Sequence, residues 1–571
     1  MEKNAYPHDH VEYAHGQDSP NDVEGLGEPE EKLTFTKFMA LVAMAFLWTG
    51  SQIPLYLYGA VPPYIYGDIG GVDRWTWFVL GNLFALGAVC PFVGSLSDLF
   101  GRRYVAIFGA CLLILGNIVS STAHTMNTFI AGMAIAGAGA GINELTSLAV
   151  TSELAPTRKR GMYVSVLIFT ILPFCPSVLW GQLIAYYGSW RYVGLLCGVW
   201  AFIGLVLTAV FYFPPPRANS VGLSRKETLA RIDFIGGFLS IVGLLLFMAA
   251  IQWGGYQYPW TSAHVLAPLI IGLVMFGLFI LYEIKWAKYP MFPGKILREP
   301  RILALTLVIT FISGSNFFSV LLFWPTQSYN VYGHDPWQIG IRNLALGFPI
   351  LAGACIVLVL MSWTRGHIRG LMLVSCILMT AGGGAMAALR LDNLWLVYIL
   401  LTISGLGIGG IVVPASIITT IICPDELIAT VAALTLSIRV LGGAIGYTIY
   451  YNVFASRFVV AATASIGKAC VINGITDKKV IVEAIEYTAA GLLPALRTLP
   501  GVTNDKIYND LVLAGQEAYA YAYPYVYYVS LAFGGVSIVC SLFLGDIKKY
   551  MTDHVAVHME EVPKHGKGRA A

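Results

Sequence analysis

Charge is what this chain has least of. Among its 571 residues only 12% are Asp, Glu, Lys or Arg, whereas 57% are hydrophobic and the mean hydropathy is +0.70. A soluble domain carries about 25% charged residues, so this chain has too few charges to cover the several soluble domains that its length would suggest. Its apolar runs are too long for the short alternating strands of a barrel. The sequence therefore predicts an all-α integral membrane protein.

Other features are missing as well. The net charge of +3 gives no sign of a nucleic-acid partner, and the nine cysteines lie almost entirely in apolar runs, so no disulfide framework is expected. The ten histidines do not cluster, and no Gly-Lys pair is followed by Ser or Thr as in a phosphate-binding loop. These absences argue against a metalloenzyme and an ATP-driven pump, and we expect no cofactor and no metal.

The apolar runs predict about fourteen membrane spans. They are expected at 38–58, 75–97, 104–122, 127–150, 162–186, 192–213, 234–253, 264–283, 303–325, 338–361, 371–389, 394–422, 428–454 and 524–544. Positive charges that flank spans stay in the cytosol, and most Lys and Arg lie in the loops on one side when both termini are cytosolic. We expect a monomer in the plasma membrane, with a vacuolar or vesicle membrane as the alternative.

Two segments of the chain share one pattern. Gly137, Gly139 and Gly141 precede Pro156 by the same spacings with which Gly405, Gly407 and Gly409 precede Pro424. Glycine ladders on their own only allow helices to pack closely, but the matched prolines favour duplicated halves in a 6+2+6 layout. The expected units are a disordered cytosolic N-tail (1–34), a six-helix bundle (35–213), a two-helix insert (214–300), a second six-helix bundle (301–544) and a cytosolic C-tail (545–571).

A short charged segment joins the second and third predicted spans. It reads Gly94-Ser-Leu-Ser-Asp98-Leu-Phe-Gly101-Arg102-Arg103. Glycine allows a tight turn, Asp98 can cap the next helix, and the two arginines are expected at the level of the lipid phosphates. The alternative is an ordinary charged loop.

This segment resembles the signature loop of the major facilitator superfamily, with Leu99 where that family has a cation. The fourteen-span layout is similar to the drug:proton antiporter branch. Residues 144–161, 232–237, 253–255 and 437–446 resemble the fungal trichothecene efflux pump family. The resemblance implies two bundles that rock about a central cavity, driven by protons, with Gly94, Asp98, Gly101, Arg102 and Arg103 as the gating loop.

Two ionisable residues lie deep within predicted spans, where a charge is costly and usually has a function or a partner. Glu144 lies about 13 Å along its helix from Glu153 at the cytosolic end, at about 1.5 Å per residue. We interpret Glu144 as a candidate proton carrier, or else as a structural carboxyl hydrogen-bonded to a neighbouring helix. Arg439 must pair with an anion or with carbonyl groups, for which Glu144 and a negatively charged substrate are the candidates.

Further residues are candidates for a hinge and for a substrate cavity. Pro173 and Pro176 remove backbone donors and are expected to bend the fifth span. A mostly apolar cavity with a few hydrogen-bonding groups suits a bulky amphipathic molecule, whereas aromatic residues at the membrane interface are the alternative. The candidate cavity residues are Trp48, Gln52, Asn316, Phe317, Phe318, Tyr447 and Tyr450.

The sequence thus favours a secondary active transporter whose partners are a small molecule, protons and the lipid bilayer. Its expected activity is proton-coupled efflux of a secondary metabolite, toxin or drug. Import of an iron-chelating siderophore is the alternative within transport, and a membrane-bound enzyme is a more distant one. The segment 455–523 reads as exposed helical pieces that cap the outer mouth or form a solvated loop.

Overall fold

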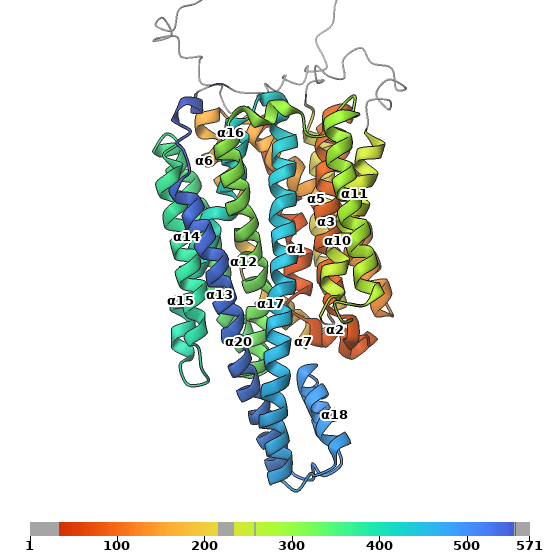
Figure 1. Cartoon of the computed structure of the whole chain (residues 1–571). Coiled ribbons are helices and arrows are strands. Elements are labelled where there is room, and N and C mark those ends of the chain that lie inside the picture. Colours follow the sequence, from red (N-terminus) through yellow and green to blue (C-terminus); the bar gives the residue numbers. More distant parts are fainter. Residues whose placement is uncertain (1–33, 215–232, 256–257, 553, 555–571) are drawn as a thin grey trace, which may run out of the picture.

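The computed structural model describes residues 34–214, 233–255, 258–552 and 554, except for the side chains of Ser95, Asp98 and Leu99 (Figure 1). The expected N-tail before residue 34 and C-tail beyond 554 lie outside these residues. Within the described ranges the regular structure is helical, apart from one isolated bridge between Gly254 and Tyr258. The predicted all-α architecture is therefore confirmed.

The helices before residue 214 form what we call the first half. Its long helices are α1 (Phe35–Tyr58), α3 (Thr76–Phe100), α4 (Arg102–Ser121), α5 (Met126–Leu154) and α8 (Arg191–Phe211), together with the shorter α2 (Pro62–Ile69), α6 (Arg160–Phe169) and α7 (Ser177–Tyr187). The next two helices, α10 (Phe234–Trp253) and α11 (Ala263–Lys285), pack on each other, and α10 also contacts α3 and α17.

The helices after residue 299 form what we call the second half. They are α12 (Pro300–Tyr332), α13 (Pro336–Trp363), α14 (Ile368–Ala385), α15 (Leu394–Val412), α16 (Pro414–Ile422), α17 (Ile428–Ile472), α18 (Lys478–Ala489), α19 (Leu493–Leu496) and α20 (Asp505–Leu542). Division of the chain into two bundles of six and an inserted pair remains a prediction.

Thirteen helices among the described residues are long and apolar enough to cross a membrane. The predicted span at 162–186 is missing from this number because it is broken into α6, a short 3-10 turn at Leu172–Phe174, and α7. Pro173 and Pro176 lie at the break, where each removes a backbone donor from the helix. With α6 and α7 taken together as one interrupted span, the structure agrees with the predicted fourteen.

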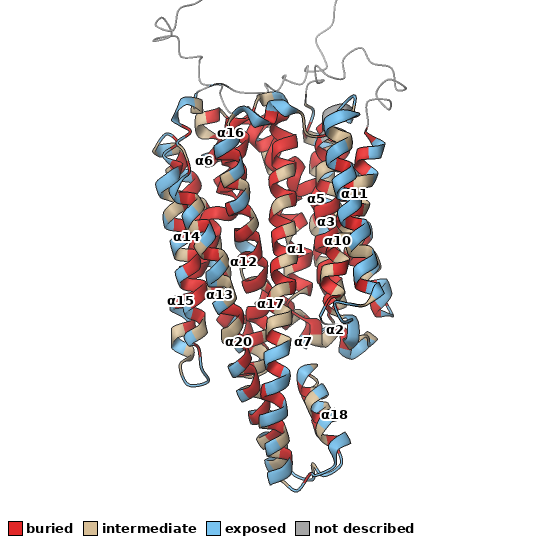
Figure 2. Cartoon of the chain, in the orientation of Figure 1, coloured by how far each residue is buried: buried red, intermediate tan, exposed pale blue. Residues whose placement is uncertain are grey.

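Buried residues concentrate on the inner faces of the helices, and exposed residues on the outer faces (Figure 2). Many exposed side chains are large and apolar, such as Ile270, Leu273 and Val274 on α11, which has only three buried residues. Such a surface would be unstable in water but suits contact with lipid. The chain is thus built to bury its polar groups inside and to present hydrocarbon outward.

The two glycine ladders pack in equivalent ways. A Cβ atom at Gly139 would lie 2.5 Å from the backbone nitrogen of Leu113 on α4, and one at Gly407 would overlap the backbone of Met379 on α14. Each ladder therefore lets its helix approach the preceding helix backbone to backbone. This equivalence agrees with the duplication that the sequence pattern indicates.

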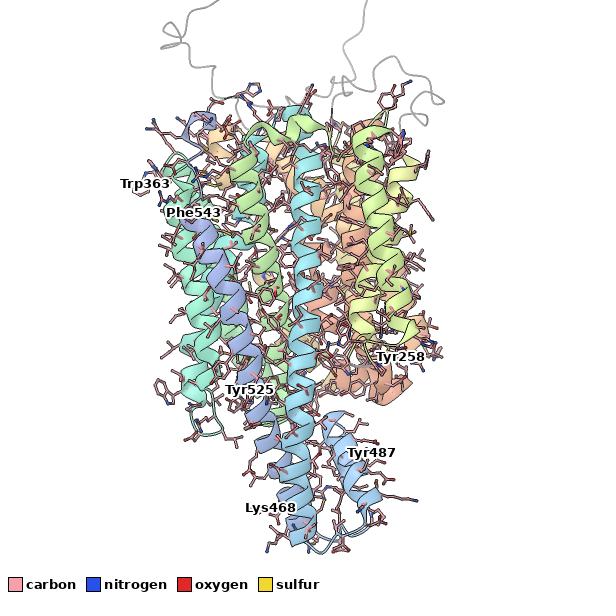
Figure 3. The ribbon with its side chains drawn as sticks, in the orientation of Figure 1. Tyr258, Trp363, Lys468, Tyr487, Tyr525 and Phe543 are labelled. Carbon is pink, nitrogen blue, oxygen red and sulfur yellow. The ribbon has the colours of Figure 1, made fainter. Side chains whose placement is uncertain are left out.

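At one end the second half continues past the bundle as a helical extension, which comprises the end of α17, α18, α19 and the start of α20 (Figure 1). Lys468 and Tyr487 mark its two sides in Figure 3. Aromatic rings join α17 to α20 within it: the ring centroids of Phe458 and Tyr519 are 4.3 Å apart. The segment 455–523 is therefore mostly helix continuous with the spans on either side.

Close packing at the ladder leads to a first prediction. Gly407→Ala should destabilise the protein by about 1–3 kcal/mol, because an added methyl in a tightly packed interface forces the backbones apart. The measurement is thermal unfolding of the purified protein in detergent. Gly277→Ala on α11 is the control, since nothing lies within 4 Å of a Cβ there. Equal melting temperatures for the two variants would contradict the prediction.

Candidate functional site

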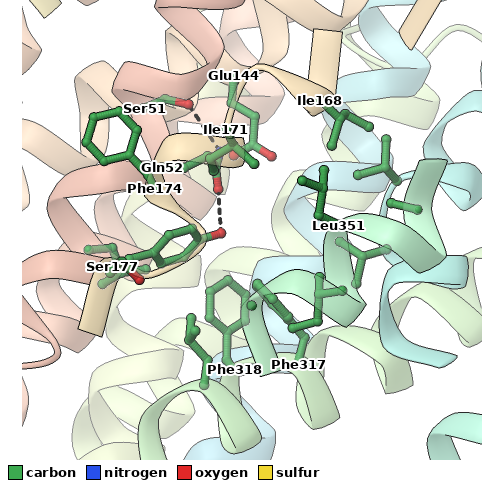
Figure 4. A pocket seen from close by; sticks show the side chains of 18 of the residues that line it. Ser51, Gln52, Glu144, Ile168, Ile171, Phe174, Ser177, Phe317, Phe318 and Leu351 are labelled. Carbon is green, nitrogen blue, oxygen red and sulfur yellow. Dashed lines mark hydrogen bonds between the residues drawn. The ribbon is translucent and has the colours of Figure 1, made fainter. Parts of the chain in front are cut away.

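A cavity lies between the two halves, lined by helices from both (Figure 4). Its wall is largely apolar, with Leu83, Leu86, Ile168, Ile171, Phe174, Leu321, Ile350, Leu351 and Val440 among the lining residues. Its polar side chains are Ser51, Gln52, Tyr56, Asn82, Glu144, Ser177 and Arg439. Such a cavity accommodates a mostly apolar molecule and orients it with a few hydrogen bonds.

An ion pair crosses the cavity from one half to the other. The guanidinium of Arg439 on α17 donates to Oε1 of Glu144 on α5, and the two residues are only 5% and 2% exposed. The Nε atom of Arg439 has no hydrogen-bond partner among the described residues. The structure thus shows that Glu144 is the anion that Arg439 requires.

A short hydrogen-bonded chain runs along α1 beside this pair. The Tyr56 hydroxyl donates to Oε1 of Gln52 at 2.9 Å, and Nε2 of Gln52 donates to Oγ of Ser51 at 3.1 Å (Figure 4). These side chains line the same cavity as Glu144. Ser51 and Tyr56 were not predicted from the sequence. Tyr56 lies four residues after Gln52 and therefore on the same side of a helix, whereas the spacing gives no such signal for Ser51.

The predicted cavity residues divide into two groups. Trp48, Gln52, Phe317 and Phe318 line the cavity together with the ion pair. Asn316, Tyr447 and Tyr450 do not line it. The substrate-binding role of all seven residues remains a prediction.

Asn316 and Tyr450 lie in a separate small pocket within the second half, where the Tyr450 hydroxyl donates to Oδ1 of Asn316 at 2.9 Å. Tyr447 packs against Phe323, with ring centroids 5.2 Å apart. These three residues do not line the central cavity as the structure describes it.

The segment from Gly94 to Arg103 comprises the last turns of α3, the connecting Gly101 and the start of α4, at one end of the bundle, which we call the basic end. Gly101 has φ +83°, a conformation that favours glycine and allows the chain to turn there. A Cβ atom at Gly94 would lie 3.2 Å from Cα of Thr430 on α17, so this glycine lets the two halves approach closely. The predicted capping role of Asp98 falls on a side chain outside the described residues.

The sequence placed both arginines of this segment at the level of the lipid phosphates. In the structure their surroundings differ. Arg102 is 2% exposed and pairs with Glu153, which is 3% exposed, at the end of α5. Arg103 donates to the carbonyl oxygen of Ala209 at 2.7 Å and lies 3.9 Å from the centre of the Phe213 ring. Arg102 is therefore held inside the protein by a buried carboxylate. A gating role for the segment remains a prediction.

A second contact at the basic end bridges the halves. Arg160, at the start of α6, is 1% exposed, and donates to the carbonyl oxygen of Thr420 at 2.8 Å and to Oδ1 of Asp425 at 3.1 Å. Arg160 is not among the residues that the sequence singles out. The available signal was position, because Arg160 and Asp425 both lie within a few residues after the equivalent prolines Pro156 and Pro424.

The broken span α6–α7 places Pro173 and Pro176 beside the cavity, whose wall includes Phe174, Cys175 and Ser177. The packing of α13 on this span is close, since a Cβ atom at Gly340 would lie 2.7 Å from Cα of Leu179. The break therefore forms part of the site, and the hinge role of the two prolines remains a prediction.

Two helical halves with an ion-paired cavity between them have the fold of the major facilitator superfamily. Solved structures support this fold. The human organic anion transporter MFSD10 (TETRAN) is 14% identical with a TM-score of 0.51, over 90% of this chain and 100% of that chain. A double-tryptophan mutant of XylE is 12% identical with a TM-score of 0.54, over 90% and 98%.

The sequence profile of the fungal trichothecene efflux pump (TRI12) family matches residues 35–568, and the chain belongs to that family. It is 28% identical to the trichothecene efflux pump TRI12 of Fusarium sporotrichioides, over 92% of this chain and 88% of that protein. It is 27% identical to the transporter gkaD of Penicillium citrinum, over 94% and 90%. The protein is therefore a multi-pass efflux transporter with a small-molecule substrate, and not an enzyme.

The bridge at Arg160 leads to a second prediction. Arg160→Gln should loosen the basic end, because it removes the charge that holds Asp425 of the other half. We expect several-fold faster maleimide labelling of Cys175, a cavity residue, in protein whose other cysteines are replaced by serine. Lys295→Gln is the control, since its pair with Glu426 is exposed and involves no residue of the first half. Equal labelling rates for the two variants would contradict a gating role for Arg160.

Proposed function

We propose that this chain exports a bulky, mostly apolar secondary metabolite from the cytosol by alternating access, in exchange for protons that Glu144 carries. Family membership supports export, and a relative over nearly its full length is named a trichothecene efflux pump. The apolar wall of the cavity, with its few polar side chains, supports an amphipathic substrate. The positive-inside rule supports a cytosolic basic end.

The observation that carries the proton mechanism is the Glu144–Arg439 pair. Its members come from different halves, both are buried, and both line the cavity. A rocking motion that separates α5 from α17 therefore acts directly on the pair. Removing the partner from a buried charge costs several kcal/mol, so motion of the halves and the charge state of Glu144 are linked.

The linkage gives a transport cycle. With the pair intact, Glu144 is a carboxylate that satisfies Arg439, and the cavity carries no net charge from these two residues. In this state the cavity binds substrate from the cytosol. When the cavity opens to the outside, a proton from that side neutralises the carboxyl, the pair opens, and the substrate leaves. The protonated protein then returns empty to the cytosol-facing state. Release of the proton on the cytosolic side restores the pair. One proton thus enters as substrate leaves.

Nothing in the structure favours siderophore import over export, and the family to which the chain belongs is one of efflux pumps. We therefore propose export as the single direction of transport under an inward proton gradient.

The mechanism leads to a third prediction. Glu144→Gln keeps the size and hydrogen bonding of the side chain but cannot bind or release a proton. In proteoliposomes with an acidic lumen, accumulation of a radiolabelled trichothecene should fall to the level of empty liposomes. Movement of the same compound down its own gradient should persist and become independent of pH.

Glu153→Gln is a matched control for this experiment, because Glu153 is also a buried, ion-paired carboxyl on α5 but does not line the cavity. The control should retain pH-driven accumulation in whatever fraction of the protein folds. If Glu144→Gln still accumulated substrate against its gradient with unchanged dependence on pH, the proton role of Glu144 would be refuted. If wild-type protein accumulated no trichothecene, trichothecenes would be excluded as its substrates.

A further inference from the structure

The chain that follows α20 crosses from the second half to the first at the basic end. We call residues 544–554 the strap, of which all but residue 553 are described. It begins where α20 ends, continues past the turn between α13 and α14 and the start of α12, and finishes beside the short 3-10 turn Thr157–Lys159 that precedes α6. The strap therefore touches both halves.

The first part of the strap is fixed to the second half. Leu544 and Ile547 are buried, and the backbone nitrogen of Ile547 donates to the carbonyl oxygen of Gly366 at 3.2 Å. Glu299, just before α12, pairs with Lys549 and accepts a hydrogen bond of 2.8 Å from the Tyr550 hydroxyl. The hydrogen bond from Lys549 holds the pKa of Glu299 below its usual range. These apolar and charged contacts make this part an anchor.

The part of the strap after Tyr550, which we call the tip, contacts the first half through its backbone. The amide nitrogen of Thr157 donates to the carbonyl oxygen of His554 at 2.9 Å, and that of Arg158 donates to the carbonyl oxygen of Thr552 at 2.8 Å. Both amides stand at the start of a helical turn, where N–H groups have no acceptor within the helix. The strap supplies those acceptors, and water can replace them when the tip leaves.

The tip also reaches the bridge between the halves. His554 Nε2 lies 2.8 Å from Oδ2 of Asp425, whose other oxygen, Oδ1, accepts from Arg160 at 3.1 Å. One carboxylate of the second half is thus held by Arg160 of the first half and by the tip of the strap. The tip, Asp425 and Arg160 form a single cluster at the basic end.

From this arrangement we propose that the strap is a releasable lock that holds the basic end closed. Its anchor belongs to the second half and its tip binds the first half, so the halves cannot separate at this end until the tip detaches. Release of the tip is then a step of the transport cycle and a point at which the C-terminal segment controls the rate. The inference rests on the alternating access proposed above, but not on the substrate or on proton coupling.

Truncation tests the lock with the chain otherwise complete. Ending the protein after Tyr550 removes the tip and keeps the anchor, and should speed maleimide labelling of Cys175 several-fold in the background that lacks the other cysteines. Ending it after residue 555 is the matched control and should leave labelling unchanged. His554→Ala should give an intermediate increase, since the backbone contacts remain. Equal labelling of both truncated proteins, each shown to be folded by its melting temperature, would overturn the proposal.

Cross-linking holds the tip in place and so tests whether transport requires the tip to detach. In the cysteine-free background, Arg158→Cys with Thr552→Cys places two thiols at hydrogen-bonded positions on the turn and the tip. Oxidation should stop transport, and reduction should restore it, whereas neither single variant should respond. Transport that continues in fully cross-linked protein would show that the tip need not detach. Loss of proton coupling in Glu144→Gln would leave both results unchanged, so failure of the lock and failure of the proton mechanism can be told apart.

Discussion

The structure depends on a constraint that the bilayer sets: a charge within it must have a partner. Glu144 and Arg439 satisfy each other from opposite halves, and each would be left buried and uncompensated without the other. Breaking a buried pair by removing one member costs about 3–5 kcal/mol. The pair therefore holds the two halves in register at the centre of the molecule, and the same cost makes it a place where a proton can change which arrangement is favoured.

Backbone packing makes this register possible. A side chain can bridge two helices only if their axes are close, and the closest approaches occur at glycines. A Cβ atom at Gly314 on α12 would overlap the carbonyl group of Arg439 itself, and Gly442, one turn further along α17, contacts the backbone of α12 in the same way. The helix that carries the arginine is thus fixed against α12 at the charged residue and one turn beyond it. Small residues here determine where the guanidinium points.

Much of the fold could be predicted from the sequence because each membrane span requires a long run of apolar residues. The spacing of glycines and prolines indicated a repeat. The rule that a buried cation needs an anion gave Glu144 as one of two candidate partners of Arg439, beside a charged substrate, and the structure pairs Arg439 with Glu144. The break at Pro173 and Pro176 followed from the missing backbone donors, although its effect on the length of the helices became clear only in the structure.

The rest depends on which residues meet in three dimensions. Arg102 with Glu153 and Arg160 with Asp425 join segments far apart in the chain, and nothing local distinguishes these arginines from exposed loop cations. Tyr447 and Asn316 show a second difficulty. A helix inside a membrane bundle is apolar on every side, so its sequence does not reveal which side faces the cavity.

The helical extension has a mechanical consequence. Helix α17 continues without interruption from the buried Arg439 to Ile472, a distance of roughly 50 Å at about 1.5 Å per residue. The turn that follows α18 meets the first half, where the Tyr66 hydroxyl donates to the carbonyl oxygen of Ala490 at 2.6 Å. A tilt of α17 by about 10° at the ion pair would displace its far end by about 9 Å. The extension is thus a lever arm that converts a small motion at the centre of the membrane into a large one outside it.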